Sequence, residues 1–260
     1  AAEEIGTVMG GPLDLGDVLG RRTAELHRAL SSGGDGSDFG IEALTSDRLS
    51  GLVDEVKGEA TALLDRLAGQ GARLDETGQA LAEAVLARRE ALLERLDGLK
   101  GLTPSGGLCR VHGDYHLGQV LVVQTDVMII DFEGEPTRSL AERVAKTSPL
   151  RDVAGMLRSF DYALWSTVRR RLEFGSDPER TLAGVDSWRQ ATQGAFLAAY
   201  RATIMGAEVH PADAEAERAL LDLFLIQKAA YEVGYELSMR PDWIDIPLRG
   251  LLSLTLDEER

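Results

Sequence analysis

Two acidic residues, Asp114 and Asp131, each follow a short apolar run and lie 17 residues apart. The segment that holds them, residues 108–135, reads LCRVHGDYHLGQVLVVQTDVMIIDFEGE. Its Val, Ile and Leu bias predicts three short strands, at 108–111, 120–123 and 127–131. A turn at 124–126 would fold the last two strands into a hairpin and return Asp131 to the neighbourhood of Asp114.

Two carboxylates and the amide of Gln119 at strand ends suit a magnesium-dependent phosphoryl transfer from ATP. Asp114 would act as the base that orients the attacking hydroxyl. Gln119 and Asp131 would supply oxygen ligands that hold Mg²⁺ against the phosphates of ATP. Because such a transfer has a loose transition state, we expect the protein mainly to position the reactants and to neutralise charge.

These residues resemble the motifs of the protein-kinase-like phosphotransferases of small molecules. The catalytic loop of that group reads H-x-D-x-x-x-x-N, and His112, Asp114 and Gln119 occupy its three positions. Gln119 departs from the usual Asn: it keeps the amide oxygen and adds a methylene. The second motif of the group is matched at 130–133, IDFE. The resemblance implies the C-terminal lobe of a protein-kinase-like, aminoglycoside-phosphotransferase-like fold.

The same resemblance suggests supporting roles for three further residues. His112 is expected to hold the backbone near the metal motif. His116 lies within the loop and either approaches the nucleotide phosphates or faces solvent. Glu133 follows the metal aspartate and either assists Mg²⁺ through water or is simply solvated.

A closer resemblance is to the maltokinases, enzymes that are sometimes fused to trehalose synthase. It rests on HGDYHLGQVL, IDFEGEP, SPLRDVAGMLRSFDYA at 148–163 and KAAYEVGYELSMRPDWIDIPLRGL at 228–251. The resemblance implies ATP-dependent phosphorylation of maltose to maltose 1-phosphate, in the metabolism that leads from trehalose and maltose to glycogen-like α-glucan. It also implies a possible association with trehalose synthase.

A kinase-like fold also needs an N-terminal lobe, with a Gly-rich phosphate loop and a lysine on a strand. Only Lys57 and Lys100 precede the catalytic loop, and both lie in stretches with helical periodicity. We therefore expect this chain to supply the catalytic and sugar-binding lobe, with the N-terminal lobe missing from it. The isolated chain is then expected to be incomplete for activity.

The pattern along the chain predicts a mainly α protein with a small β hairpin region. Residues 1–100 are expected to form a linker and a helical subdomain, and residues 101–260 the catalytic hairpin and a helical acceptor-binding lobe. Apolar residues at helical spacing predict the first helices after a linker at 1–16, namely 17–30, 46–69 and 76–98. Beyond residue 137 the chain is expected to be helical, with breaks at prolines.

The predicted helix at 213–239 has an apolar stripe that belongs to the core, formed by Ile226, Ala229, Ala230, Val233 and Leu237. The opposite face carries the candidate sugar-binding residues Lys228, Tyr231, Glu232 and Tyr235. Aromatic faces stack on pyranose rings and charged groups bind sugar hydroxyls, although a solvated face would carry such residues too. Arg240 and Trp243 would close the same pocket, unless Trp243 is a core residue.

Composition excludes several classes of function. The 260 residues include 43 acidic and 28 basic residues, a net charge of −15, which disfavours a nucleic-acid partner. No apolar run has membrane-spanning length, and the acidic first residues do not resemble a signal peptide, so a cytoplasmic location is expected. The single cysteine, Cys109, excludes an internal disulfide, and its apolar context predicts a buried thiol.

Two other functions stay open. The same chemistry could act on another acceptor, such as an aminoglycoside, glucosamine or choline. A cationic acceptor would favour a cluster of acids, and the face that carries Lys228 and the two tyrosines suits a neutral sugar better. The second alternative is a non-catalytic, kinase-like lobe that binds a sugar or a partner protein. The presence of both Asp114 and Asp131 argues against it.

Overall fold

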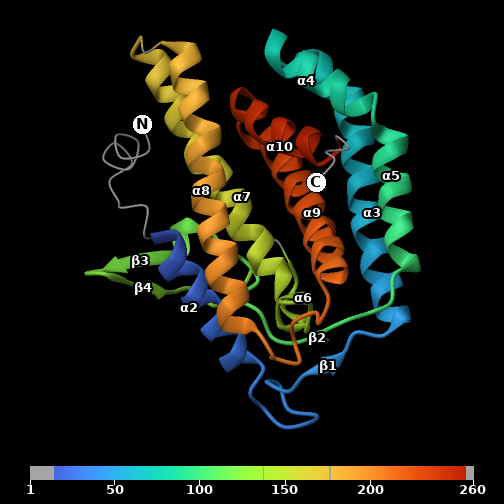
Figure 1. Cartoon of the computed structure of the whole chain (residues 1–260). Helices are drawn as coiled ribbons and strands as arrows, with labels where there is room; N and C mark the ends of the chain where they lie inside the picture. Colours follow the sequence, from blue (N-terminus) through green and yellow to red (C-terminus); the bar gives the residue numbers. More distant parts are fainter. Residues whose placement is uncertain (1–14, 137, 176, 256–260) are drawn as a thin grey trace. The chain divides into compact units, whose positions relative to one another are not determined.

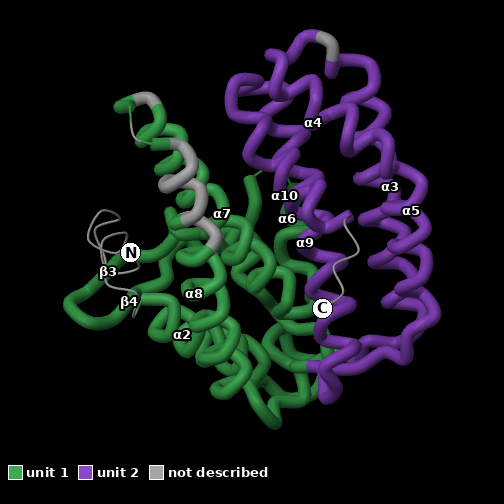
Figure 2. The backbone as a smooth tube through the Cα atoms, turned by 45° about the horizontal axis from the view of Figure 1, so that its top comes forward, with its two compact units in different colours: residues 1–42, 107–210 green, residues 43–106, 211–260 purple. Residues whose placement is uncertain are grey.

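The computed structural model describes residues 15–136, 138–175 and 177–255, and the chain forms two compact units (Figures 1 and 2). Each unit is built from two separate stretches of chain. Unit 1 comprises residues 1–42 and 107–210, and unit 2 comprises residues 43–106 and 211–260. The sequence predicted consecutive parts, 1–100 and 101–260, and that functional division stays a prediction. Most of the predicted linker, up to residue 14, lies outside the described residues.

Within the described residues, unit 1 contains three long helices, a two-stranded hairpin, the strand β2 and two short helical segments. The long helices are α2 (Leu15–Leu30), α7 (Leu150–Glu173) and α8 (Pro178–Ile204). The hairpin pairs β3 (Val120–Val123) antiparallel with β4 (Asp126–Ile129). The strand β2 (Gly107–Leu108) pairs with β1 (Glu42–Ala43), whose two residues stand on either side of the boundary between the units in the sequence. The short segments are η3 (Leu117–Gln119) and α6 (Leu140–Val144).

Helices α2 and α8 cross at very short range, and glycine makes the crossing possible. Gly16 and Gly20 lie one turn apart on α2 and face Thr192 and Phe196, which lie one turn apart on α8. A Cβ added at Gly20 would lie 2.2 Å from the Phe196 carbonyl oxygen, and one at Gly16 would lie 2.9 Å from that of Thr192. The two backbones can therefore approach only because these positions carry no side chain.

Unit 2 is entirely helical within the described residues after β1. Its long helices are α3 (Ser46–Gln70) and α9 (Ala214–Met239), and α3 packs against both α9 and α5 (Figure 1). Side chains start three of its helices: Thr45, Asp75 and Asp213 accept backbone N–H groups of the first turns of α3, α4 and α9. The shorter elements are η1 (Gly71–Arg73), α4 (Glu76–Leu86), α5 (Arg89–Gly98), η2 (Leu99–Gly101), η4 (Pro241–Trp243) and α10 (Asp245–Thr255).

The predicted elements agree with the structure in type and differ at their ends. The expected helix at 76–98 is two helices, broken at Ala87 and Arg88, because α4 packs on α10 whereas α5 packs on α3. The expected strand at 108–111 is shorter, continuing beyond β2 only as a single bridge between Cys109 and Thr147. The expected strand at 127–131 ends at Ile129. The apolar stripe predicted on α9 is buried along its whole length.

The thiol of Cys109 is buried, as predicted, and is not paired in a disulfide. Burial, together with the nearby Asp152 carboxylate, raises the pKa of this thiol to about 12. It is therefore a packing residue and not a nucleophile at neutral pH. Among the described residues, no helix is both long enough and apolar enough to cross a membrane.

The crossing of α2 and α8 gives a stability prediction. Gly20→Ala places a methyl group against the backbone of α8, so we expect the free energy of unfolding of unit 1 to fall by about 1–3 kcal/mol or more. Urea unfolding followed by circular dichroism measures the change.

Gly194→Ala is the matched control. Gly194 lies in α8, is exposed, and has no atom within 4 Å of the position of an added Cβ. Replacing a helical glycine at such a position should stabilise by about 0.5–1 kcal/mol. Equal effects of the two variants would contradict the described crossing.

Candidate functional site

The predicted catalytic loop, residues 112–119, and the end of the β3–β4 hairpin are joined through His112. The His112 ring is buried, and its Nε2–H donates to the carbonyl oxygen of Ile130 at 2.8 Å. The ring also packs against Phe132, with 4.9 Å between ring centroids. The carboxylate of Asp114 follows two residues later and is partly exposed, 21% at the side chain. His112 therefore sets the position of the loop relative to the residues on either side of Asp131.

The hairpin brings Gln119 and Asp131 together. Val120 pairs with Ile129 in the antiparallel register, so the residues just outside the hairpin lie side by side. The Gln119 Nε2 donates to Asp131 Oδ2 at 3.0 Å, and the backbone carbonyl of Gln119 accepts the N–H of Ile130 at 3.0 Å. Asp131 itself has φ of +66°, a left-handed conformation that is strained by about 1–3 kcal/mol for a non-glycine residue. The predicted strand ends early because the chain turns here.

Gln119 and Asp131 offer an amide oxygen and a carboxylate, the hard oxygen donors that Mg²⁺ prefers. The described residues contain no group of three or more His, Cys, Asp or Glu that could hold a metal ion by itself. Magnesium sites in phosphoryl-transfer enzymes commonly have one or two protein ligands, with substrate phosphates and water completing the shell. The pair fits such a site, in which the nucleotide supplies further ligands.

Asp152, in the first turn of α7, holds the predicted catalytic loop through hydrogen bonds to its backbone. Asp152 is 2% exposed and its two oxygens accept the backbone N–H groups of His112 at 2.7 Å and of Gly113 at 3.0 Å. A third contact comes from the Nε2 of His27 on α2, at 3.2 Å. In the first turn of α7, the Asp152 carboxylate also complements the helix dipole. Its actual partners are distant in the chain, so local pattern could not identify them.

Burial by itself would raise the pKa of the Asp152 carboxyl. The hydrogen bond from His27, its electrostatic attraction and the N–H of Gly113 outweigh burial, and the pKa of Asp152 is lowered. Tyr200 on α8 lies behind His27, with its hydroxyl 3.0 Å from the His27 Nδ1. The lowered pKa favours the ionised carboxylate, which three donors hold in place beneath the loop backbone.

One face of α7 contacts the loop at several residues. Asp152, Gly155 and Ser159 are spaced by three and four residues, so they line one side of the helix. A Cβ at Gly155 would lie 2.7 Å from the carbonyl oxygen of Tyr115, and the Ser159 Oγ accepts the N–H of Leu117 at 3.0 Å. This polar and small stripe on a buried helix is the signal in the sequence that could have located the contact.

Helix α2 holds the other side of the loop and the hairpin tip. Thr23 donates its hydroxyl to the carbonyl of Leu19, so the Tyr115 hydroxyl donates to Thr23 Oγ1 at 2.8 Å. Arg22 binds Asp126 at the hairpin turn through both oxygens of its carboxylate. The hydrogen bond from Arg22 lowers the pKa of Asp126 to about 2. Both contacts join α2 to the segment that carries the candidate catalytic residues.

The residues after Asp131 are held by arginines. The carbonyl oxygen of Glu133 accepts from Arg143 at 3.3 Å, while the Glu133 residue is exposed. Glu135 is buried and pairs with Arg138 at 3.3 Å, so it is not a solvated acid. Gly134 has φ of +74°, a conformation in which glycine avoids strain.

The predicted acceptor residues all belong to unit 2, whereas the predicted catalytic and metal residues all belong to unit 1. Five of the six predicted acceptor residues, all except Glu232, form a continuous row of aromatic rings and cations. The Lys228 Nζ lies 5.0 Å from the Tyr231 ring centroid, and the Tyr231 and Tyr235 rings stack at 6.5 Å. The Arg240 guanidinium lies 5.6 Å from the Tyr235 ring and 5.5 Å from that of Trp243. We call these five residues the aromatic ladder.

Glu232 does not share the exposure of this ladder. It is 8% exposed, against 37% for Tyr231 and 44% for Tyr235. The carboxylate that supports the ladder is Glu236, which is 1% exposed and binds Arg240 through both oxygens. Glu236 was not among the predicted acceptor residues, although its spacing of four residues from Arg240 is typical of a helical ion pair.

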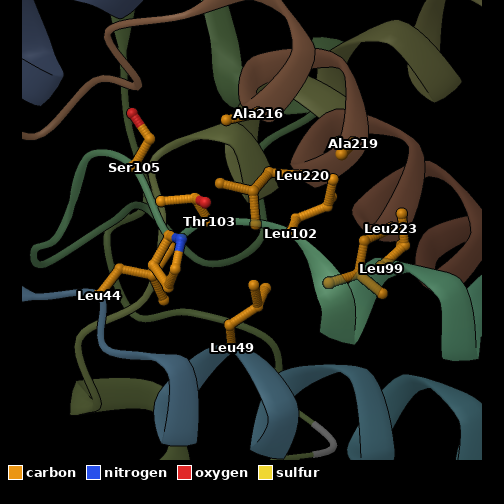
Figure 3. Close-up of a pocket in the computed structure, with 11 residues that line it drawn as sticks. Leu44, Leu49, Leu99, Leu102, Thr103, Ser105, Ala216, Ala219, Leu220 and Leu223 are labelled. Carbon is orange, nitrogen blue, oxygen red and sulfur yellow. The ribbon is translucent and has the colours of Figure 1, made fainter.

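An apolar pocket with an empty volume of about 280 Å³, open to solvent, also lies in unit 2 (Figure 3). Its lining contains no charged residue, so it offers no charged side chain for phosphate or metal binding. The lining residues are Leu44, Leu49, Leu99, Leu102, Thr103, Pro104, Ser105, Ala216, Ala219, Leu220 and Leu223.

Residues 11–190 match the phosphotransferase enzyme family. The chain is 30% identical over 243 residues to a glucosamine kinase from Streptacidiphilus jiangxiensis, covering 91% of this chain and 48% of that protein. It is also 30% identical over 183 residues to a glucosamine kinase from Mycolicibacterium smegmatis, covering 68% and 41%. A solved glucosamine kinase in complex with glucosamine, ADP and inorganic phosphate is similar, with a TM-score of 0.72 and 26% identity over 93% of this chain and 51% of that chain.

The chain therefore spans about half the length of the curated relatives that it matches. The comparisons support the predicted kinase-like fold, whereas the ATP-using sugar kinase stays a prediction. They do not support maltose as the specific acceptor: these relatives are glucosamine kinases, and glucosamine was one of the alternative acceptors.

The buried Asp152 network gives a prediction about pH. Asp152→Asn should lower the free energy of unfolding at pH 7 by about 3 kcal/mol, because His27 and two N–H groups lose an ionised partner. The lowered folded-state pKa means that this stabilisation is present above the ordinary aspartate pKa of about 4 and is lost as the pH falls through the folded-state value. Urea unfolding at several pH values should show the difference between the variant and the unmodified chain shrinking below about pH 4.

Asp161→Asn, on the same helix, is the contrasting variant. Burial raises the pKa of Asp161, and the nearby Arg158 only partly offsets it. Ionisation of Asp161 therefore opposes folding, so the unmodified chain should gain stability relative to this variant as the pH falls. Parallel pH trends for the two variants would contradict the described network.

Proposed function

The chain belongs to the phosphotransferase enzyme family, and on that premise we propose that it supplies the catalytic and acceptor-binding part of a kinase. The kinase would transfer the γ-phosphoryl group of ATP to a hydroxyl of a small sugar, with glucosamine as the first candidate acceptor. The observation that carries the proposal is the hydrogen bond between Gln119 and Asp131 at the end of the hairpin, next to the contact of His112 with Ile130 that ties the loop of Asp114 to this end. The relatives that are glucosamine kinases support the acceptor class.

In the proposed mechanism, Asp114 accepts a hydrogen bond from the acceptor hydroxyl and orients its oxygen toward the γ-phosphorus. The proton passes to Asp114 as the new oxygen–phosphorus bond forms and ADP leaves. Gln119 and Asp131 would hold Mg²⁺, which when bound neutralises charge on the phosphate oxygens. The protein's contribution is mainly position, and the Asp152 network keeps the Asp114 backbone in place for it.

The nucleotide needs further groups. Protein-kinase-like folds cover the phosphates with a Gly-rich loop and a strand lysine. Both lysines that precede the catalytic loop are already engaged in unit 2, Lys57 with Asp97 and Lys100 with Asp54. The relatives are about twice as long as this chain. We therefore propose that a further lobe supplies the phosphate-binding lysine.

The aromatic ladder is the proposed source of acceptor contacts. Stacked tyrosine rings offer apolar faces to a pyranose, and Arg240 is held in place by Glu236. Maltose stays the second candidate, because the cations at Lys228 and Arg240 suit a neutral sugar better than an ammonium-bearing one. The motifs shared with maltokinases point the same way.

The base assignment makes a kinetic prediction. Asp114→Asn keeps the shape of the side chain and removes its basicity, so turnover of the whole natural protein should fall by about 10²–10⁴-fold. Acceptor affinity should change by less than about twofold, since the change acts on the transition state. Coupled assay of ADP release and calorimetric titration measure the two quantities. Turnover at the unmodified rate would exclude Asp114 as the base.

The acceptor assignment makes a binding prediction. Calorimetric titration of glucosamine, maltose and kanamycin into the chain should give saturable binding of a small sugar that Tyr235→Ala abolishes. Met239→Ala is the control, because Met239 is exposed on the same helix and is not part of the ladder. Binding of maltose without glucosamine would reverse the order of the two acceptors. Sugar binding that survives Tyr235→Ala would exclude the ladder.

A further inference from the structure

We propose that His116 is a positioning residue that orients the carboxylate of Asp114. This inference rests on the proposed function, because it concerns the base of the proposed phosphoryl transfer. It assigns Asp114 as the partner of His116 and places the proton of the neutral His116 ring on Nε2. The sequence left only two possibilities for this residue, a role near the nucleotide phosphates or exposure to solvent.

The His116 ring is held in place by a backbone N–H group of the same loop. His116 is the N-cap residue of η3, and its Nδ1 accepts the N–H of Gly118 at 3.0 Å. The ring lies directly over Gly118: a Cβ at that position would be 2.8 Å from Nδ1 and 2.7 Å from Cε1. Glycine at 118 thus leaves the space that the ring occupies, and the cap hydrogen bond sets its orientation.

The cap also determines the tautomer. Because Nδ1 accepts a hydrogen bond from Gly118, the proton of the neutral ring is on Nε2. Nε2 is the ring nitrogen that lies 3.8 Å from Asp114 Oδ2. That distance is longer than a hydrogen bond, so the contact is a close electrostatic one. Contacts of this kind often shorten when substrate binds.

A donor beside one carboxylate oxygen has a specific consequence. The Nε2–H attracts Oδ2, so the carboxylate is held in one rotation about its terminal bond. The second oxygen, Oδ1, is then presented to the acceptor hydroxyl in a fixed direction. Misplacing a reacting group by about 1 Å can cost on the order of 10²-fold in rate, so this restraint is significant.

Two substitutions separate this role from simple capping of the loop. His116→Asn retains an acceptor oxygen near the position of Nδ1, and Asn is a good N-cap residue, but it lacks the distal N–H. His116→Gln places an amide N–H farther out, near the position of Nε2. If His116 only caps η3, His116→Asn should behave like the unmodified protein. If it positions Asp114, His116→Asn should be impaired and His116→Gln should recover part of the loss.

The kinetic arm uses the whole natural protein. We expect His116→Asn to lower kcat by about tenfold or more, while KM for ATP and for the sugar stays within about twofold. In a protein that already carries Asp114→Asn, His116→Asn should lower kcat no further, because the residue acts through Asp114. Full kcat in His116→Asn would overturn the inference, and so would an additive loss in the double variant.

The spectroscopic arm needs no turnover. In the chain labelled with ¹⁵N-histidine, long-range ¹H–¹⁵N correlation at a pH where the His116 ring is neutral reports which nitrogen carries the proton. We expect the Nε2–H tautomer, and Asp114→Ala should move the Nε2 resonance while Nδ1 stays in place. Ser159→Ala is the control: it removes the hydrogen bond to Leu117 in the same turn and should leave Nε2 unchanged.

An Nδ1–H tautomer, or an Nε2 resonance that ignores Asp114→Ala, would overturn the inference. Absence of turnover from the unmodified protein with every acceptor would count against the proposed function. In that case the spectroscopic arm alone decides whether His116 contacts Asp114 through Nε2–H, so the two failures are distinguishable.

Discussion

The candidate site depends on one buried carboxylate. Asp152 accepts two consecutive backbone N–H groups of the catalytic loop and is itself held by His27. An ionised acid in a dry interior is stable only when its oxygens are fully hydrogen-bonded, so these contacts constrain each other. They bring α2, α7 and the loop together in unit 1. The glycines of α2 allow α8 to approach closely, and Tyr200 of α8 contacts the other nitrogen of His27.

Upon this base, the hairpin sets the geometry of the candidate metal ligands. Gln119 directly precedes β3 and Ile130 directly follows β4. The antiparallel pairing of the two strands therefore places these two residues within hydrogen-bond distance of each other. The left-handed conformation at Asp131 then ends the extended path of the strand. Such strain is commonly found at functional sites, where the surrounding structure maintains it. Here Arg143 fixes the chain just after the turn, and His112 fixes the chain just before it.

The proposed acceptor side is organised differently, since it consists of aromatic rings and cations on α9 and the segment that follows it in unit 2. The tyrosines of this ladder contact one another and their flanking cations, and the buried Glu236 holds Arg240. The periodicity of α9 predicted its buried stripe correctly, because burial of apolar residues follows the helical repeat. It did not predict that Glu232 is buried. A helical wheel gives the direction of a side chain and does not say which directions the neighbouring helices cover.

The sequence by itself determined the mainly helical fold, the hairpin and the identity of Asp114, Gln119 and Asp131 as candidates, because these follow from local periodicity and from motifs within one short segment. Only the tertiary structure decided how these residues are held. The partners of Asp152 lie 40 residues away at His112 and 125 residues away at His27. The split of the expected helix at Ala87 and the depth of Glu236 likewise depend on packing between distant helices. Local patterns specify elements and chemistry, whereas the contacts that fix a reactive group arise between segments whose proximity only the folded chain creates.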